Sequence, residues 1–372
     1  MTSPLWNPVV PEGKRHPAYE HVRTAEGCAG DREYIDALWT EYEPLADKHF
    51  VGEFQRDFHS RLWEMELAGM LQDLGLEPKS AGKGPDLQIK LNGVKVWFEA
   101  VAPTRGERPD AVVDYDEGAF PDRAIELRYA SAAQQKFDKW KSYLEDGIVN
   151  ADEAFVIAIS AAKLTPAHIE EPDRLRIANI LFALGETIYS VPVSGDEPSE
   201  VTMQPRPYLR KHSGAPVESA FFLKPDYDAI SAVLFSPNHL KNLPQSQGRP
   251  RGDDAFLLHN PNAQVPLAIG SIRVGRETWA EGNEFRCKDW RRPRPPSPRW
   301  SPGHAFQLKR DTKLRRSRRF RNVAIPLAPG QQVFCSRRRG KWVLVSVPPA
   351  DGNAWIDGWV HKKYLERVGS DD

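Results

Sequence analysis

The sequence predicts an α/β protein with a mixed central sheet flanked by helices, followed by a small all-β barrel. Long helical patterns alternate with short, continuous apolar runs in the first three quarters of the chain, which is typical of a sheet covered by helices. A Pro- and Arg-rich stretch at residues 288–303 interrupts this pattern. Beyond it, only short strands and turns follow, as in a small β domain.

Each expected element has its own signal. Residues 1–50 should form an N-terminal extension, irregular to about residue 30 and then helical from Arg32 to His49. Further helical patterns cover residues 54–76, 122–144 and 173–182. Continuous apolar runs predict buried strands at residues 154–160, 229–236 and 254–260. We therefore expect one mixed-sheet domain at 51–287, a semi-rigid linker at 288–303 and a β module at 304–368.

Composition limits the class of protein. With 372 residues, of which 40% are hydrophobic and 27% charged, the chain can form two or three packed domains. The N-terminal segment lacks a signal-peptide apolar run, and no stretch approaches the ~20 apolar residues of a membrane span. Cys28, Cys287 and Cys335 are widely spaced and odd in number, which predicts neither a disulfide framework nor a zinc site. We expect a cytoplasmic protein that does not enter the membrane.

The net charge is zero, but its distribution is uneven. Between Arg286 and Lys341 there are eighteen Lys and Arg against two Asp and Glu, so this segment carries +16 and the rest of the chain −16. A dense basic block attached to a neutral-to-acidic body is typical of proteins that bind a polyanion. A solvated, solubilising tail is the alternative. The density of RRPRPPSPR and KLRRSRRFR favours a polyanion such as nucleic acid.

The stretch GPDLQIKLNGVKVWFEAV predicts a hairpin with two carboxylates facing each other. Asn92-Gly93 is suited to a type I′ turn, and counting outward from this turn sets Asp86 opposite Glu99. Like charges at opposed positions are destabilising, but a divalent cation would convert them into a binding site. A solvated polar face with a slightly different register is the alternative, and the hairpin alone does not decide between them. Alternation predicts one apolar face, formed by Leu87, Ile89, Leu91, Val94, Val96 and Phe98.

Two helix positions could complete a metal-dependent hydrolase site, which needs about three carboxylates and a group that assists the water or the leaving group. Glu64 lies at the margin of a helix that is apolar over much of its circumference, although the pattern by itself favours a surface glutamate. Lys136 lies at the centre of an apolar stripe. Such a lysine either extends its ammonium group to solvent or meets an anion, and periodicity supports both equally. The stripe comprises Ile125, Tyr129, Ala132, Trp140 and Tyr143.

These residues resemble the signature of the PD-(D/E)XK nuclease superfamily, which has the restriction-endonuclease-like fold. The family pattern is a helix glutamate, a Pro-Asp that opens one strand and an acidic-x-Lys on the next; Glu64, Pro85-Asp86 and Glu99-Ala100-Val101 follow it in order and spacing. The resemblance covers about residues 51–270. It implies an endonuclease or exonuclease that hydrolyses phosphodiester bonds, of DNA rather than RNA. It also implies Mg²⁺ or Mn²⁺ held by Asp86, Glu99, the Ala100 carbonyl and Glu64.

One position departs from this pattern, because Val101 stands where the family has its lysine. Some members supply the lysine from a neighbouring helix, and Lys136 is the candidate here. If Lys136 points elsewhere, the resemblance implies a catalytically inactive relative that binds nucleic acid or a protein partner. Gln135 resembles a helix glutamine of some members, but the helical wheel turns it away from Lys136, and we do not place it in the site.

The C-terminal module is similar to bacterial SH3-like domains. The matching stretches are Gly340-Lys341-Trp342, Gly358-Trp359-Val360 and Tyr364-Leu365. In that family Trp342 and Trp359 serve equally as core anchors or as ligand contacts. The resemblance implies a peptide or protein partner, while the arginines of the module suit the nucleic-acid backbone, a contact that carries no sequence information.

Overall fold

The computed structural model describes residues 3–113, 121–164, 167, 170, 175–190, 200–239, 250–282, 284–291, 305–310, 312–315, 324–339, 341–347 and 356–367. The chain divides into two compact units, Met1–Arg292 and Pro293–Asp372. The first unit therefore starts at the N-terminus, whereas the sequence analysis separated residues 1–50 from a domain beginning at residue 51. None of the helices in the described residues is long and apolar enough to cross a membrane.

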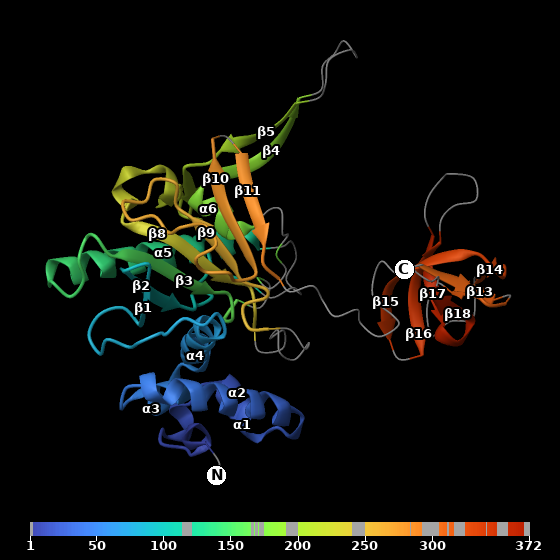
Figure 1. Ribbon diagram of the computed structural model, residues 1–372, viewed down its shortest axis with the longest axis horizontal. Coiled ribbons are helices and arrows are strands. Elements are labelled where there is room, and N and C mark those ends of the chain that lie inside the picture. Colours follow the sequence, from blue (N-terminus) through green and yellow to red (C-terminus); the bar gives the residue numbers. More distant parts are fainter. Residues whose placement is uncertain are drawn as a thin grey trace. The chain divides into compact units, whose positions relative to one another are not determined.

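The first unit is an α/β structure built on a seven-stranded mixed sheet with the order β1-β2-β3-β8-β9-β10-β11 (Figure 1). Strands β2, β3 and β8 run parallel, as do β9 and β10, while the other neighbouring pairs are antiparallel. The strands are β1 (Leu87–Leu91), β2 (Val94–Val101), β3 (Ala154–Ser160), β8 (Ile230–Ser236), β9 (Phe256–His259), β10 (Arg276–Glu281) and β11 (Glu284–Asp289). Two-stranded sheets accompany it, formed by β4 (Leu184–Ser190) with β5 (Glu200–Pro205) and β6 (Tyr208–Arg210) with β7 (Pro216–Glu218).

Helices cover both faces of this sheet. On one face α4 (Phe58–Asp73) packs against the sheet, and α1 (Pro17–Thr24), α2 (Ala29–Tyr42) and α3 (Phe50–Arg56) lie beyond α4; all four are drawn in blue in Figure 1. The opposite face is covered by α5 (Asp122–Glu145) and α6 (Arg176–Leu181). Because successive side chains of a strand point to opposite faces, Phe98 and Val156 join the first core, while Trp97 and Phe155 join the second.

The hairpin has the predicted register. Residue pairs run from Leu87↔Phe98 at one end to Leu91↔Val94 beside the turn. Asn92 and Gly93 have φ angles of 51° and 92°, the left-handed conformations that a type I′ turn requires. The predicted apolar face is buried apart from its tip, where Leu91 is half-buried and Val94 is 40% exposed because both lie beside the turn, at the margin of the first core.

The N-terminal region is more ordered than predicted. Helix α1 forms within the part expected to be irregular, because Pro17 occupies its first turn and the His16 side chain caps it by accepting a hydrogen bond from the Ala18 N–H. The single helix expected at 54–76 is instead divided between α3 and α4, since Asp57 has the non-helical angles φ −129° and ψ 64°. Strands β10 and β11 were missed, because their charged residues hide the apolar pattern on which the prediction relied.

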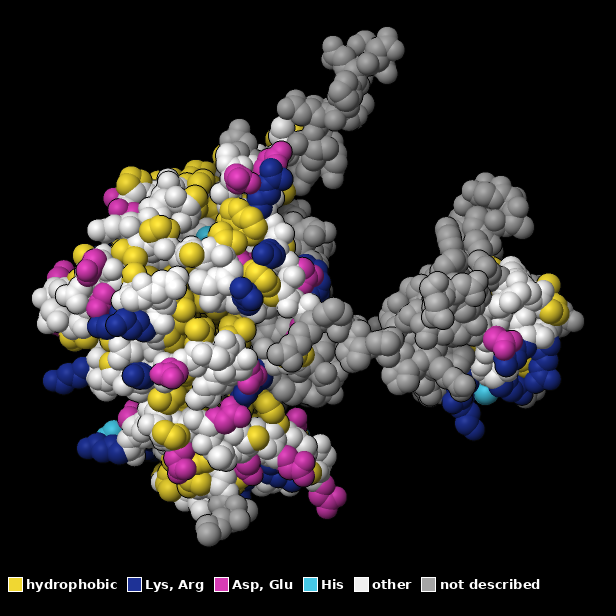
Figure 2. Space-filling view, viewed as in Figure 1, with side chains coloured by type: hydrophobic (Ala, Val, Ile, Leu, Met, Phe, Trp, Pro, Cys, Tyr) yellow, Lys and Arg dark blue, Asp and Glu magenta, His cyan; other side chains and the backbone are white. Residues whose placement is uncertain are grey.

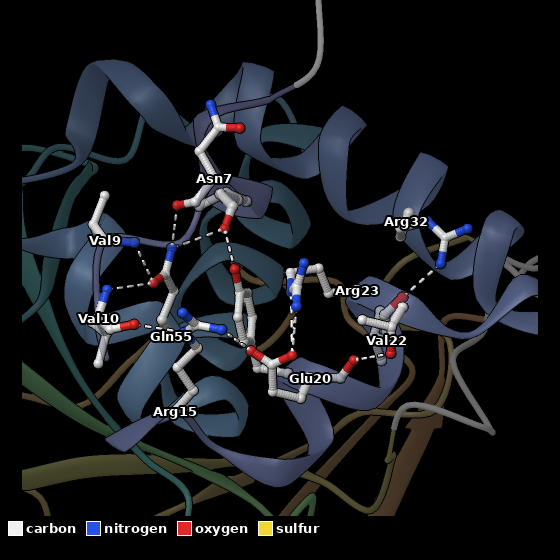
Figure 3. A network of polar contacts seen from close by, with 12 residues as sticks. Asn7, Val9, Val10, Arg15, Glu20, Val22, Arg23, Arg32 and Gln55 are labelled. Carbon is white, nitrogen blue, oxygen red and sulfur yellow. Dashed lines mark hydrogen bonds and ion pairs between the residues drawn. The ribbon is translucent and has the colours of Figure 1, made fainter. Parts of the chain in front are cut away.

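A segment that we call the N-terminal strap, residues 3–16, is fastened to α3 by one buried glutamine (Figure 3). The Oε1 atom of Gln55 accepts hydrogen bonds from the N–H groups of Val9 and Val10, at 2.9 and 3.1 Å. Its Nε2 atom donates to the carbonyl oxygens of Leu5 and Asn7, at 3.2 and 2.7 Å. All four hydrogen-bonding positions of this amide are therefore used, which fixes the strap against the helix that leads into α4.

The second unit is all-β, as predicted. Its sheet has the order β14-β13-β17-β16-β15-β12-β18, with every described pair antiparallel. The strands are β12 (Ala305–Leu308), β13 (Thr312–Arg315), β14 (Ala324–Leu327), β15 (Gln332–Arg339), β16 (Trp342–Val347), β17 (Ile356–His361) and β18 (Leu365–Arg367). The predicted linker at 288–303 falls almost wholly outside the described residues, and its first residues, Lys288 and Asp289, instead complete β11.

Candidate active site

Asp86 and Glu99 come together as the hairpin predicted. Asp86 immediately precedes β1, and its Oδ2 atom accepts a hydrogen bond of 2.7 Å from the N–H of Ala100, the residue after Glu99 on β2. Glu99 is fully buried. Burial, and then the negative charge of Glu99, raise the pKa of Asp86, although Lys136 and the Ala100 N–H act in the opposite direction. The two carboxylates therefore share one partly buried site and repel each other there.

Two lysines from α5 reach the buried carboxylate. The Oε1 atom of Glu99 accepts hydrogen bonds from Lys136 Nζ at 2.8 Å and from Lys139 Nζ at 2.6 Å. The side chain of Lys136 is 15% exposed and that of Lys139 is 45% exposed. Of the two outcomes left open for Lys136, the structure confirms contact with an anion. Burial alone would lower the pKa of Lys139, but the charge of Glu99 and its hydrogen bond raise it above the usual value.

Glu64 is buried rather than on the surface, so the interpretation that the sequence pattern favoured is wrong for this residue. Helix α4 is covered on two sides, by the sheet and by the N-terminal helices, and leaves Glu64 only 7% exposed. Its carboxylate accepts two hydrogen bonds from Arg61, at 2.7 and 2.8 Å. Burial, and then the charge of Asp86, raise the pKa of Glu64 to about 8 despite Arg61. Glu64 thus lies within the electrostatic field of the carboxylate pair.

Three residues of this neighbourhood escaped the sequence analysis. Lys139 lies three positions after Lys136, a spacing that places both on one helix face, so the signal was present in the sequence. Arg61 of α4 and Glu53 of α3 form a 2.5 Å ion pair that extends the contact with Glu64, but charged residues in a helical pattern do not by themselves indicate such a contact between two helices. Only the tertiary covering of α4 turns them into part of a site.

The oxygen atoms of this polar cluster are suited to a hard divalent cation, although the side chains are too far apart to coordinate one ion together. Among the described residues, no group of three or more His, Cys, Asp or Glu side chains is close enough to hold a metal ion as it stands. However, Glu99 Oε2 is buried without a hydrogen-bond partner in the structure as described. Asp86, Glu99, Glu64 and the Ala100 carbonyl would supply only oxygen ligands, the kind that Mg²⁺ and Mn²⁺ prefer.

Val101 and Gln135 stay outside this polar cluster. Val101 is the last residue of β2 and packs against the second core. Val101 is therefore apolar, and the ammonium groups beside Glu99 come from α5. Gln135 is exposed, in agreement with the helical wheel.

No family model matches the chain, and neither a curated protein nor a solved structure shows significant similarity to it. The functional assignment therefore depends on the geometry described above.

The second unit presents a cationic surface around one tyrosine. Figure 2 shows Lys and Arg side chains gathered on one part of its described face. Arg310 and Lys363 both lie over the ring of Tyr364, each at 4.9 Å from its centroid. Aromatic rings flanked by cations are suited to stacking with bases beside a phosphate backbone. Trp342 and Trp359 are half-buried, so their exposure leaves both of their expected roles open.

Proposed function

We propose that the protein is a metal-dependent nuclease of the PD-(D/E)XK type, which uses Mg²⁺ or Mn²⁺ to hydrolyse phosphodiester bonds of nucleic acid, with DNA as the preferred substrate. The observation that carries this proposal is the convergence of Lys136 and Lys139 on the buried Glu99 beside Asp86. This arrangement supplies the lysine that Val101 does not. The order of helix glutamate, hairpin and later central strand agrees with the restriction-endonuclease-like fold.

Each residue has a role in this scheme. Asp86, Glu99 and the Ala100 carbonyl would hold the cation, and Glu64 would contribute directly or through water. When bound there, the cation would supply Lewis acidity toward the phosphate and would lower the pKa of a bound water. Lys136, the less exposed lysine, stabilises negative charge that develops on the phosphate oxygens. Lys139 keeps Glu99 paired and oriented when Lys136 turns toward the substrate.

The second unit is proposed to be an SH3-like accessory domain that holds the nucleic-acid backbone. Its support is the surface around Tyr364, where Arg310 and Lys363 provide cations next to an aromatic ring. Contacts of this kind strengthen binding without reading sequence. A protein partner is the other ligand class that the SH3-like resemblance implies.

A catalytically inactive nuclease fold that only binds nucleic acid or a protein is the second candidate. Two observations favour it: Val101 occupies the family's lysine position, and both lysines that could replace it are engaged by Glu99. Both candidates would bind nucleic acid, but only the enzyme would cleave it, so a cleavage assay distinguishes them.

The test is incubation of the purified protein with plasmid, linear duplex, single-stranded DNA and RNA in the presence of Mg²⁺, Mn²⁺ or EDTA. We expect metal-dependent cleavage that is lost in Asp86→Ala and retained in Asp152→Ala, because Asp152 is an exposed aspartate remote from the carboxylate pair. Absence of cleavage on every substrate, with nucleic-acid binding intact, would replace the enzyme by the inactive-scaffold candidate.

A further inference from the structure

The second unit carries two paired aromatic side chains outside its core. On β16, Val343 and Val345 are fully buried in that core, and on β17 so is Val360. Because successive side chains of a strand point to opposite faces, Trp342 and His361 lie on the outer face. They are directly paired across the two strands, and both are half-buried. Large rings that gather outside a core indicate a contact surface.

Tyr364 extends this pair into three neighbouring rings, which we call the aromatic row. The ring centroids of Trp342 and His361 lie 5.4 Å apart, and those of His361 and Tyr364 lie 6.1 Å apart. Neighbouring ring planes make angles of 77° and 71°. The Nδ1 atom of His361 accepts a hydrogen bond of 3.3 Å from the N–H of Lys363, which fixes the central ring. The rings are therefore close together without stacking on one another.

Cationic residues surround the aromatic row, because three segments of the chain meet there. The N–H of Lys362 donates to the carbonyl of Lys341 at 2.9 Å, and the N–H of Lys309 donates to the carbonyl of Tyr364 at 2.9 Å. These contacts add three lysines to the two cations that lie over the tyrosine ring. Glu366 offsets part of this charge, at 3.7 Å from Lys309. The surface as a whole is complementary to a polyanion.

The geometry of the aromatic row favours a single strand over a duplex. Each strand of a duplex advances about 3.4 Å per base and keeps its bases parallel. The rings of the row are further apart and nearly perpendicular, so a continuous stack of bases cannot follow them. An extended single strand can turn each base toward a separate ring while its phosphates meet the lysines. An acidic peptide would satisfy the cations but offers no bases to cover the rings.

We infer that the aromatic row stacks unpaired bases and that the second unit therefore binds single-stranded nucleic acid in preference to duplex. This inference rests on the proposed function, in which the second unit holds nucleic acid, and it names the form that this unit selects. It gives Trp342 the role of a ligand contact rather than a core anchor. Stacking on a ring tolerates every base, so little sequence preference is expected.

The experiment measures binding of fluorescent single-stranded DNA, RNA of the same sequence and duplex DNA in EDTA, so that metal-dependent cleavage does not contribute. We expect Trp342→Leu to weaken single-strand binding about 5- to 150-fold, the range for loss of one stacked base, and to leave duplex binding unchanged. Trp342→Phe keeps an aromatic ring and should bind single strands within about threefold of the wild type. Tyr208→Leu is the matched control, because it removes an exposed tyrosine of the first unit that has Lys224 over its ring.

A second measurement needs no variant. A single strand that contains a fluorescent purine analogue should lose fluorescence when the wild-type protein binds it, because stacking on an aromatic ring quenches the analogue. This result decides if circular dichroism shows that Trp342→Leu fails to fold. Binding without any change in fluorescence would contradict stacking.

The outcomes separate this inference from the proposed function. Weaker single-strand binding in Trp342→Leu, with binding retained in Trp342→Phe, supports the aromatic row whether or not the wild-type protein cleaves. Loss of cleavage in Asp86→Ala concerns the carboxylate pair alone. Unchanged single-strand affinity in Trp342→Leu, equal losses in the two Trp342 variants, or tighter binding of duplex than of single strands would overturn the inference. Binding of an acidic peptide without binding of nucleic acid would overturn it as well.

Discussion

Replacing Lys136 by methionine distinguishes a structural role of this lysine, as the ion-pair partner of Glu99, from a catalytic role in turnover. Methionine keeps the length of the side chain in the apolar stripe of α5 but removes the charge. Lys136 contributes one charge-assisted hydrogen bond, about 1.5–3 kcal/mol, while Glu99 keeps its 2.6 Å contact with Lys139. We therefore expect Lys136→Met to lose no more than about 3 kcal/mol of unfolding free energy and to remain folded.

The effect on turnover should be much larger. Removal of one group that stabilises developing charge typically lowers kcat about 10²- to 10³-fold. Lys139→Met should lower stability by less than about 1 kcal/mol, because its side chain is 45% exposed and its ion pair is screened by solvent. The double variant leaves Glu99 as an unpaired buried charge, which costs about 3–5 kcal/mol.

The assay combines urea unfolding with single-turnover cleavage at saturating protein for the wild type, both single variants and the double variant. A Lys136→Met protein that cleaves within threefold of the wild-type rate would refute the catalytic role of this lysine. Equal stability of the double variant and the wild type would refute the view that Glu99 needs a cationic partner.

Two further predictions concern stability. Gln55→Ala should lose about 2–4 kcal/mol of unfolding free energy, measured by urea unfolding, because two of the four hydrogen bonds of Gln55 are fully buried. The exposed control Gln135→Ala should change the unfolding free energy by less than about 0.5 kcal/mol. Equal losses in the two variants would contradict this prediction. Burial raises the pKa of Glu66 to about 7 despite its hydrogen bond from Tyr34, so the native state holds a proton more tightly than the unfolded state from about pH 4.5 to 7, and stability falls as pH rises through this window. Glu66→Gln should therefore match the wild type near pH 5 and exceed it by up to about 3 kcal/mol at pH 8; a constant difference between the two proteins would refute this.

The sequence predicted the features that depend on local rules. The Asn92-Gly93 turn determines its own register, so the pairing that brings Asp86 to Glu99 could be counted from the sequence. The position of Lys136 on the inner face of α5 likewise follows from helical periodicity. Both elements are long and regular, and their packing agrees with their patterns.

The features that escaped prediction depend on contacts between distant segments. The sequence pattern indicates a surface position for Glu64. Its burial is produced by helices α2 and α3, and their packing against α4 cannot be read from the sequence. His259 is a buried core histidine whose Nε2 lies 2.9 Å from Glu277 Oε1. Its partner, however, lies on β10, a strand that the apolar pattern did not reveal.

The turn of the first hairpin has a consequence for the chemistry at its far end. Neighbouring residues of β2 face opposite cores, so a shift of one residue in the pairing would exchange Glu99 with Phe98 and direct an acid into the apolar layer beneath α4. One extra residue after Gly93 that is not absorbed by a bulge would thus remove the carboxylate from the lysines of α5 without altering any residue of the site. The length of the Asn92-Gly93 loop therefore determines on which face of the sheet the Glu99 carboxylate lies.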